Sequence, residues 1–247
     1  MKQFFTKLVQ LSHSMTGQLI PKWYICFMYI PKDFEVKDQE LILVFLEQHP
    51  FGSLAVNGSD GFPALVHIPF TCEFNDSRNC LEFHVAKENL IVSAIREVSH
   101  GKMIVLGAHG YVSSSVYTHI NVPTYNYEAV HVSGEIKRLT NPELKNHLSK
   151  LVDSFEANRE NKIQTGSSVS LQIATVRMSQ WPADLIDSYL EEIVGYRLEI
   201  QELEAAFKLS QNRNEVDFNR ILDDLNSGTS NDQQLAEAMK QSKCPIK

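Results

Sequence analysis

Three short segments of alternating apolar residues, separated by turn-forming clusters, follow one another between residues 51 and 86. The first, residues 51–56, ends at the Asn, Gly and Asp cluster of residues 57–61, and the second, residues 62–74, ends at a similar cluster at 75–79. Alternation places successive side chains on opposite faces of a strand, and such clusters favour tight turns. Strands joined by short turns pair antiparallel, so this region predicts antiparallel hairpins.

Before and after these strands, apolar residues recur at helical spacing in five segments. Asp38 can cap the first helix and Pro50 can end it, whereas Asn89 can cap the second and Gly101 can end it. The second helix is expected at residues 91–98, and the last three at 144–155, 185–193 and 216–225. Additional strands are expected at 103–106, 130–139, 169–177 and 196–203, with a long loop at 107–128 and a polar connector at 157–168.

The order of these elements indicates the fold class. Strands outnumber helices in the first half of the chain and do not alternate with them as in a doubly wound sheet. We therefore expect an α+β fold, mainly antiparallel β, with a barrel or sandwich at its centre. The core is expected at residues 28–140, and residues 141–242 complete the same domain. Residues 1–27 are expected to be an extension outside the fold, with Met28 as a candidate natural start, and residues 243–247 a tail.

Composition excludes several classes of function. The chain has 23 Lys and Arg against 30 Asp and Glu, a net charge of -7, and its basic residues are scattered, so direct DNA binding is not expected. The four cysteines form no C-x-x-C pair and no zinc-type spacing with histidine, which favours free thiols, as in the cytoplasm, and no metal site. No apolar run reaches the roughly 18 residues that a membrane span needs.

The joint between the third strand and the second helix carries the most suggestive local chemistry. His84, Lys87 and Asn89 lie where a strand runs directly into a helix N-terminus. Free N–H groups and the positive end of the helix dipole favour an anion there, and a lysine beside them suits a phosphate. The alternative is an ordinary Asn cap with a solvated lysine.

Several histidines lie in or beside the predicted strands. His67 and His131 could donate hydrogen bonds to a buried polar ligand, could bind a metal or haem, or could be structural. In the loop before His131, Tyr125 and Asn126 follow a proline, and aromatic faces on a stiff loop suit stacking on a planar ring. Side chains that only cover the mouth of the barrel are the alternative. The chain has no nucleophile elbow and no glycine-rich phosphate loop.

Taken together, six segments resemble the PaiB family of FMN-binding negative transcriptional regulators. The likeness covers residues 28–242, and the order and spacing of the segments make it specific. The family commonly has Arg, Asn-Pro and Trp where this chain has Lys87, Asn89-Leu90 and Tyr125. The matching segments are MYIPKDF at 28–34, HIPF at 67–70, FHVAKEN at 83–89, VPTYNY at 122–127, VHVSG at 130–134 and KLSQNR at 208–213.

The resemblance implies an FMN-binding split barrel with peripheral helices and a C-terminal α/β extension, which dimerises with the flavin at the subunit interface. It implies that the strand with His67 and Pro69 lines the isoalloxazine ring and that His131 reaches the flavin. The phosphate would lie at the joint of His84, Lys87 and Asn89. Lysine can neutralise a phosphate but cannot form the bidentate fork of arginine.

Two functions follow from the resemblance. The first is a cytoplasmic, homodimeric regulator that acts indirectly through flavin, a protein partner or redox state, without direct DNA contact. The second is an enzyme, either a flavin-dependent oxidoreductase or a haem-binding or haem-degrading split barrel. No catalytic residue can be named from the sequence for either one.

Overall fold

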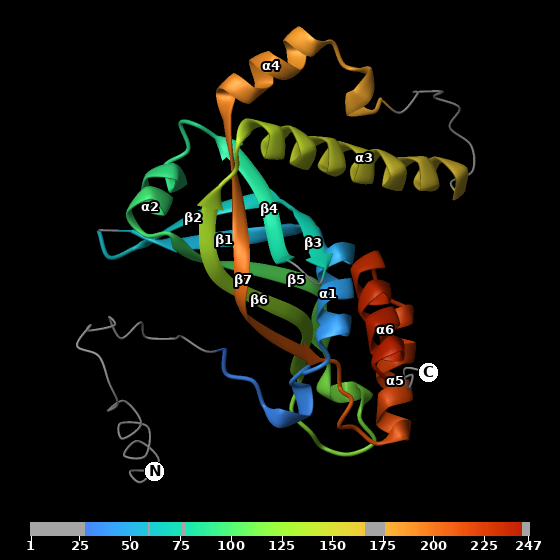
Figure 1. Cartoon of the computed structure of the whole chain (residues 1–247). Coiled ribbons are helices and arrows are strands. Elements are labelled where there is room, and N and C mark those ends of the chain that lie inside the picture. The colour runs from blue at the N-terminus through green and yellow to red at the C-terminus, as the bar shows by residue number, and fades with distance from the viewer. Residues whose placement is uncertain (1–27, 59, 76–77, 166–175, 244–247) are drawn as a thin grey trace, which may run out of the picture.

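The computed structural model describes residues 28–58, 60–75, 78–165 and 176–243, with only the backbone at 160–165 and 243. Seven strands and six α-helices lie in these residues (Figure 1). The strands are β1 Phe51–Asn57, β2 Pro63–Pro69, β3 Thr71–Asn75, β4 Arg78–Ala86, β5 His100–Val112, β6 Thr124–Arg138 and β7 Ile193–Lys208. The helices are α1 Gln39–Gln48, α2 Ile91–Glu97, α3 Asn141–Thr165, α4 Ala183–Glu192, α5 Glu215–Asn226 and α6 Ser230–Lys243, with short 3-10 turns η1 Lys32–Phe34, η2 Ser114–Val116 and η3 Met178–Gln180.

All seven strands form one antiparallel sheet in the order β2-β1-β5-β6-β7-β4-β3. The two edge strands of this order, β2 and β3, are consecutive in the chain and are separated by Phe70 alone. A flat sheet would hold its edges far apart, so this one-residue link requires the sheet to curl into a barrel. No pairing joins β2 to β3 among the described residues, which leaves the barrel split between them.

Apolar residues on the inner face of the barrel form the main core. The side chains of Leu54, Phe83, Met103, Val132 and Leu198 come from five different strands and are completely buried. Each such side chain contributes about 1.5–3 kcal/mol through the hydrophobic effect. The core therefore holds the curled sheet together across its whole width.

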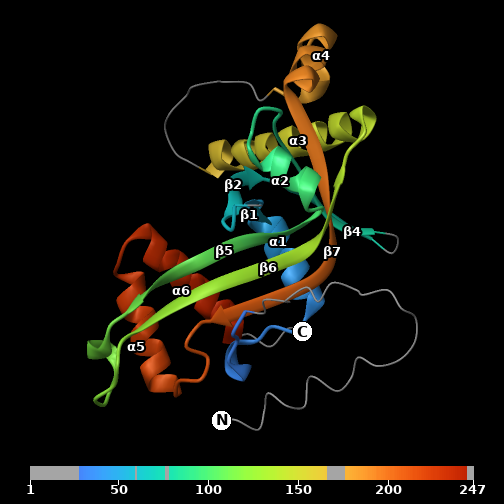
Figure 2. The ribbon, with the colours of Figure 1, turned by 90° about the vertical axis from the view of Figure 1, so that its left-hand side faces the viewer.

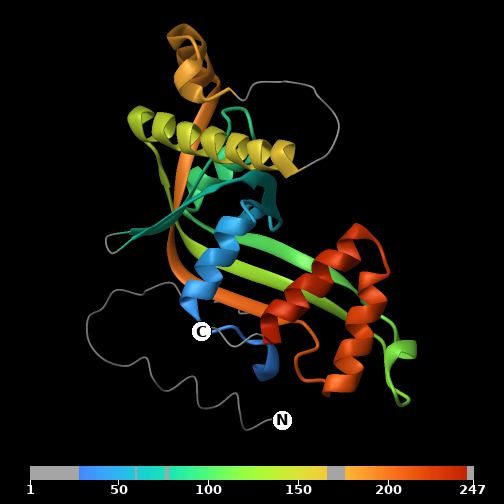
Figure 3. The ribbon, with the colours of Figure 1, turned by 90° about the vertical axis from the view of Figure 1, so that its right-hand side faces the viewer.

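The helices cover the sheet unevenly. α1 and α6 lie on one side of the β5–β6 hairpin, as Figure 3 shows, and the opposite side of this hairpin and of β7 is bare of helices in Figure 2. α3 packs on β3, β4 and β7, and together with α4 it encloses a smaller apolar cluster that includes Leu144, Leu148 and Ile186. Among the described residues, no helix is both long and apolar enough to span a membrane.

The expected α+β fold with an antiparallel barrel is confirmed, and so are the helices α1, α2, α4 and α5. The Asp38 carboxylate caps α1 as expected and accepts from the Leu41 N–H at 3.2 Å. α2 ends at Glu97, before Gly101, which lies in β5. β7 pairs with both β4 and β6, so the later half of the chain completes the barrel.

Several boundaries were wrong. The single strand expected at 62–74 is two strands, because the chain turns from one sheet edge to the other at Phe70. Half of the expected loop at 107–128 is strand, since β5 and β6 continue their pairing to Val112 and Thr124. α3 extends into the expected connector, and α6 was not expected. The strand expected at 169–177 lies outside the described residues except for residues 176 and 177, which are not in a strand.

Candidate functional site

A row of directly opposed residues crosses five strands on the outer face of the barrel. The register pairs His67 with Ser53, Ser53 with Ile104, Ile104 with His131, and His131 with Glu204. Directly opposed residues in a sheet share a face, so two of the predicted site histidines lie on one surface. We call the outer face of β2, β1, β5 and β6, with Glu204 at its border, the open face.

Hydrogen bonds organise this row at both ends. Ser53 Oγ lies 2.7 Å from His67 Nδ1, and Lys102 Nζ donates to Glu204 Oε2 at 2.8 Å. The other carboxylate oxygen of Glu204 accepts from the Met28 N–H at 2.5 Å. Burial, assisted by the Lys102 charge, lowers the pKa of His131, although Glu204 opposes the shift. His131 is therefore a neutral imidazole at pH 7, able to donate from one ring nitrogen and accept at the other.

Apolar side chains flank the polar row on the same surface. The next register row contains Leu65, Ala55 and Lys102, and Leu65 is 60% exposed. Phe51, which pairs with Pro69, is 59% exposed. Exposed apolar groups around a few polar groups suit a planar ring with a polar edge, or the face of another protein chain.

The predicted phosphate residues do not converge. His84 points under α3, where its Nδ1 lies 3.1 Å from His147 Nε2. Lys87 donates through its ammonium to the carbonyl of Glu191, at the end of α4. The Asn89 carboxamide oxygen accepts from the Ile91 N–H at 3.0 Å, a local contact just ahead of α2, whose N-cap residue is Leu90 and not Asn89 as expected.

The two predicted loop residues lie in β6 and face opposite sides. Tyr125 is half exposed on the outer face, opposite Tyr111 and near the His109 ring. Asn126 is completely buried, and its Nδ2 donates to Ser210 Oγ at 2.9 Å and lies 3.6 Å from the Met239 sulfur. Asn126 therefore anchors the C-terminal helices to the barrel.

A second polar region lies on the same outer face of the sheet, where α3 covers β3, β4 and β7. We call it the covered face. His147 of α3 is completely buried between His84 and Thr71, whose Oγ1 lies 2.9 Å from His147 Nδ1. Burial, with added repulsion from His84 and Lys150, lowers the pKa of His147 to about 3. Both imidazoles are neutral at pH 7, and both ring nitrogens of His147 have partners inside the chain.

An ion-pair network lies beside these histidines. Arg197 of β7 donates from Nε and Nη2 to one oxygen of Glu82, at 3.0 and 2.7 Å, and Nη2 also reaches Glu143 of α3 at 3.1 Å. Hydrogen bonds from the backbone and hydroxyl of Thr140, and then from Arg197, lower the pKa of Glu143 to about 2. Sequence analysis did not identify Arg197 or His147, because their partners are far away in the chain.

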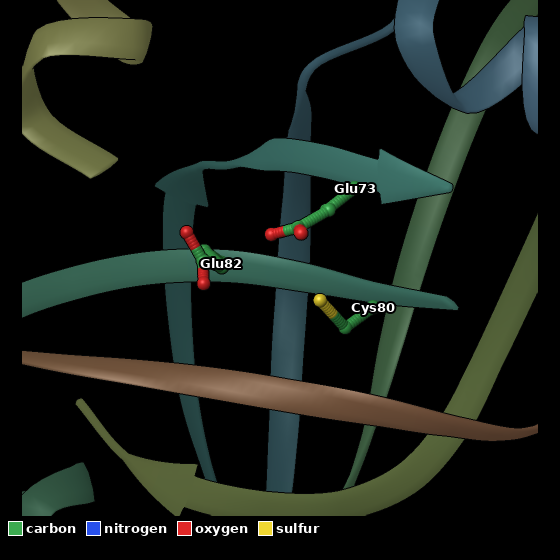
Figure 4. A group of neighbouring side chains, drawn as sticks. All are labelled: Glu73, Cys80 and Glu82. Carbon is green, nitrogen blue, oxygen red and sulfur yellow. The ribbon is translucent and has the colours of Figure 1, made fainter. Parts of the chain in front are cut away.

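One group of potential metal ligands borders this network. Glu73, Cys80 and Glu82 place a carboxylate oxygen, a sulfur and a carboxylate oxygen within 4.8 Å of one another (Figure 4). Glu82 is already paired with Arg197, and burial, then the Glu82 charge, raises the pKa of the Cys80 thiol to about 11. A protonated thiol beside a neutralised carboxylate is part of the packing under α3.

Comparison with known proteins identifies the family to which the chain belongs. Residues 28–202 match the family model described as "Putative FMN-binding domain". The chain is 33% identical to the "Protease synthase and sporulation protein PAI 2" of Bacillus subtilis, over 86% of this chain and 97% of that protein. It is 30% identical to an uncharacterized protein of Saccharomyces cerevisiae, over 53% of this chain and 92% of that protein.

Among solved structures, the FAD and heme binding protein from Mycobacterium smegmatis is similar, with a TM-score of 0.49 and 16% identity over 70% of this chain and 73% of that one. The family model covers the barrel strands from β1 to most of β7, including every residue of the row on the open face except Glu204. Five of the six motif segments lie within the matched residues, and the chain belongs to the PaiB family of proteins with an FMN-binding domain.

Proposed function

We propose that this chain binds FMN with the isoalloxazine ring on the open face. The observation that carries the proposal is the row from His67 to Glu204, in which two imidazoles, one hydroxyl and one carboxylate share a surface with the apolar side chain of Ile104. His131 provides a donor and an acceptor to the polar edge of the ring. His67 and Pro69 line its border, and Ile104 provides an apolar contact below it. Bound FMN supplies a redox-active ring, and the protein orients it and limits its contact with water.

The open face is also the proposed surface of a homodimer. Phe51, Leu65 and Leu106 are each more than half exposed there, and a flavin lying on a bare sheet would remain largely in water. A second copy related by a two-fold axis would cover both the ring and these side chains. The family membership supports this arrangement, since the resemblance implies a flavin held between two subunits.

The proposed cellular role is regulation through flavin, redox state or a protein partner, without direct DNA contact. A net charge of -7 disfavours binding to a phosphate backbone. The proposed compartment is the cytoplasm, and Cys72 and Cys80 are free thiols. In a gel-shift titration against DNA upstream of its own gene, we expect no binding that resists competitor DNA. Submicromolar, competitor-resistant binding would contradict the proposed role.

A flavin titration tests the proposed site. We expect purified protein to quench flavin fluorescence on binding, and His131→Ala to weaken binding by about 1–2 kcal/mol, the range for a lost buried hydrogen bond. His119→Ala is the matched control, because His119 is exposed in the loop after η2, outside the row. Binding that is absent, or equally strong in His131→Ala, would remove the open face as the flavin site.

A further inference from the structure

The turn from β4 into α2 is the place where the family resemblance puts the flavin phosphate, and its donors are already used. Five of the seven backbone amides from Lys87 to Ser93 donate within the chain. The amides and their acceptors are Lys87 to Glu192 O at 3.0 Å, Asn89 to Ala86 O at 3.0 Å, Ile91 to Asn89 Oδ1 at 3.0 Å, Val92 to Asn89 O at 3.0 Å and Ser93 to Leu90 O at 3.1 Å. The three amides at the start of α2 are the ones a helix usually leaves free, and here none is free.

The lysine beside this turn has another partner. The Lys87 ammonium donates to the Glu191 carbonyl in the last turn of α4, and the Lys87 N–H donates to the next carbonyl, that of Glu192. The end of a helix has carbonyls without intrahelical donors and carries a partial negative charge, so a lysine is well used there. Lys87 therefore connects β4 to α4 instead of pointing at the start of α2.

The cavity next to this turn carries the wrong charge for a phosphate. It has a volume of about 680 Å³ and lies between the β1–β2 turn and α2. Three carboxylates line it, from Asp60, Glu88 and Glu97, and its lining residues include no Lys, Arg or His. The remaining amides of the turn, at Glu88 and Leu90, belong to residues that line this same cavity. A phosphate dianion there would face carboxylate repulsion without a cation to offset it.

We propose that the chain recognises the flavin by its ring and not by its phosphate. Riboflavin has the same ring system and no phosphate, so it should bind as tightly as FMN, within about threefold, a difference of about 0.65 kcal/mol at most. This inference rests on the proposed flavin site on the open face, and it separates this chain's ligand chemistry from what the family resemblance implies for FMN.

The test compares riboflavin and FMN in separate fluorescence titrations of the full chain, each at low and high salt. We expect similar dissociation constants and no stronger salt dependence for FMN, because a bound phosphate would make binding weaken as salt rises. FMN binding more than about tenfold tighter than riboflavin would overturn the inference while leaving the flavin site intact. If neither flavin binds, the proposed function is itself wrong.

Two sets of variants sharpen the comparison. Lys87→Ala should leave the ratio of FMN to riboflavin affinity unchanged, and His131→Ala should weaken both flavins by the same factor. The double variant Glu88→Gln, Glu97→Gln removes two of the three carboxylates from the cavity. It should raise the affinity for FMN relative to the affinity for riboflavin, because a phosphate near the cavity would meet less repulsion. A Lys87→Ala protein that loses FMN affinity about tenfold and keeps riboflavin affinity would place the phosphate on Lys87 and overturn the inference.

Discussion

The open face and the covered face belong to the same side of the same sheet. Their polar residues differ in whether they are bonded to a helix of the same chain. Both contain histidines, a carboxylate of β4 or β7 and a cation. On the covered face, α3 supplies His147 and Glu143, and the imidazoles and the Arg197 guanidinium are bonded inside the chain. On the open face, no described helix supplies such partners, and His67 remains exposed.

The difference teaches how to separate structural from functional polar groups in a fold of this kind. A buried polar group that is fully satisfied within its own chain stabilises or orients the fold. A partly buried row whose groups retain free donors and acceptors needs a ligand or a second chain to complete it. By this criterion His147 belongs to the fold, and His131 belongs to the proposed flavin site.

The largest expected effect is on the covered face. Arg197→Met leaves the Glu82 carboxylate buried and without its counter-charge, so we expect the free energy of unfolding to fall by about 3–5 kcal/mol. Lys102→Met makes the same kind of change beside Glu204, but Lys102 is a quarter exposed and Glu204 keeps the Met28 N–H, so we expect a loss of about 1 kcal/mol. Urea unfolding of both variants measures the two losses. Equal losses would contradict the view that the ion pair on the covered face matters more for stability than the ion pair on the open face.

A smaller effect is expected from acid. The pKa of His147 is about 3 in the folded chain and 6.5 in the unfolded chain, so between these values only the unfolded state binds the proton. Stability contributed by the neutral imidazole is therefore complete above pH 6.5 and is lost as the pH falls toward 3, by about 2 kcal/mol between pH 7 and pH 5.

Replacing the imidazole of His147 isolates its contribution to the pH dependence of stability. His147→Gln cannot titrate, so its unfolding free energy should fall by about 2 kcal/mol less than that of the unmodified chain between pH 7 and pH 5. Between pH 7 and pH 9 the two proteins should show parallel curves. Urea titrations at the three pH values provide the comparison, and a variant with the same acid sensitivity as the unmodified chain would show that the covered histidines do not behave as described.

The smallest expected effect is on association. Leu65→Glu introduces a charge among the exposed apolar side chains of the open face, so the proposed dimer should dissociate at least about tenfold more readily, while the fold of the subunit is unchanged. Leu185→Glu, on exposed α4, is the matched control. Sedimentation equilibrium measures both. A 28.1 kDa monomer before any substitution, or a dimer indifferent to Leu65→Glu, would move the interface elsewhere.

Most of the fold could be predicted from local patterns. Alternating residues predicted β1 and β4, helical spacing predicted α1, α2, α4 and α5, and Asp38 was identified as the cap of α1. The far halves of β5 and β6 were missed because their outer residues include polar and aromatic side chains such as His109, Tyr111 and Tyr125, a composition typical of a loop. α6 was missed because only a narrow stripe, with Leu235, Ala236 and Met239, is buried in an otherwise polar sequence.

The site was predictable only in part. His67 and His131 were identified as candidates from their positions in strands, but nothing local shows that Ser53 and Ile104 connect them, since this depends on the register of three strand pairs. The prediction of a phosphate site at His84, Lys87 and Asn89 rested on their closeness in sequence, whereas their side chains have separate partners in the fold. Neighbours in sequence at a strand-to-helix joint can point in three directions, and the partner of His84 lies 63 residues away on α3.

The position of β7 has a consequence for how the protein is made. β7 fills the gap between β4 and β6, although more than a hundred residues separate it from β4 in the chain. While a ribosome is still synthesising residues 193–208, β4 and β6 are already complete and each has an unpaired edge open to other chains. The barrel can close only after most of the chain has been synthesised, so we infer that the nascent protein depends on protection from aggregation until its last strand arrives.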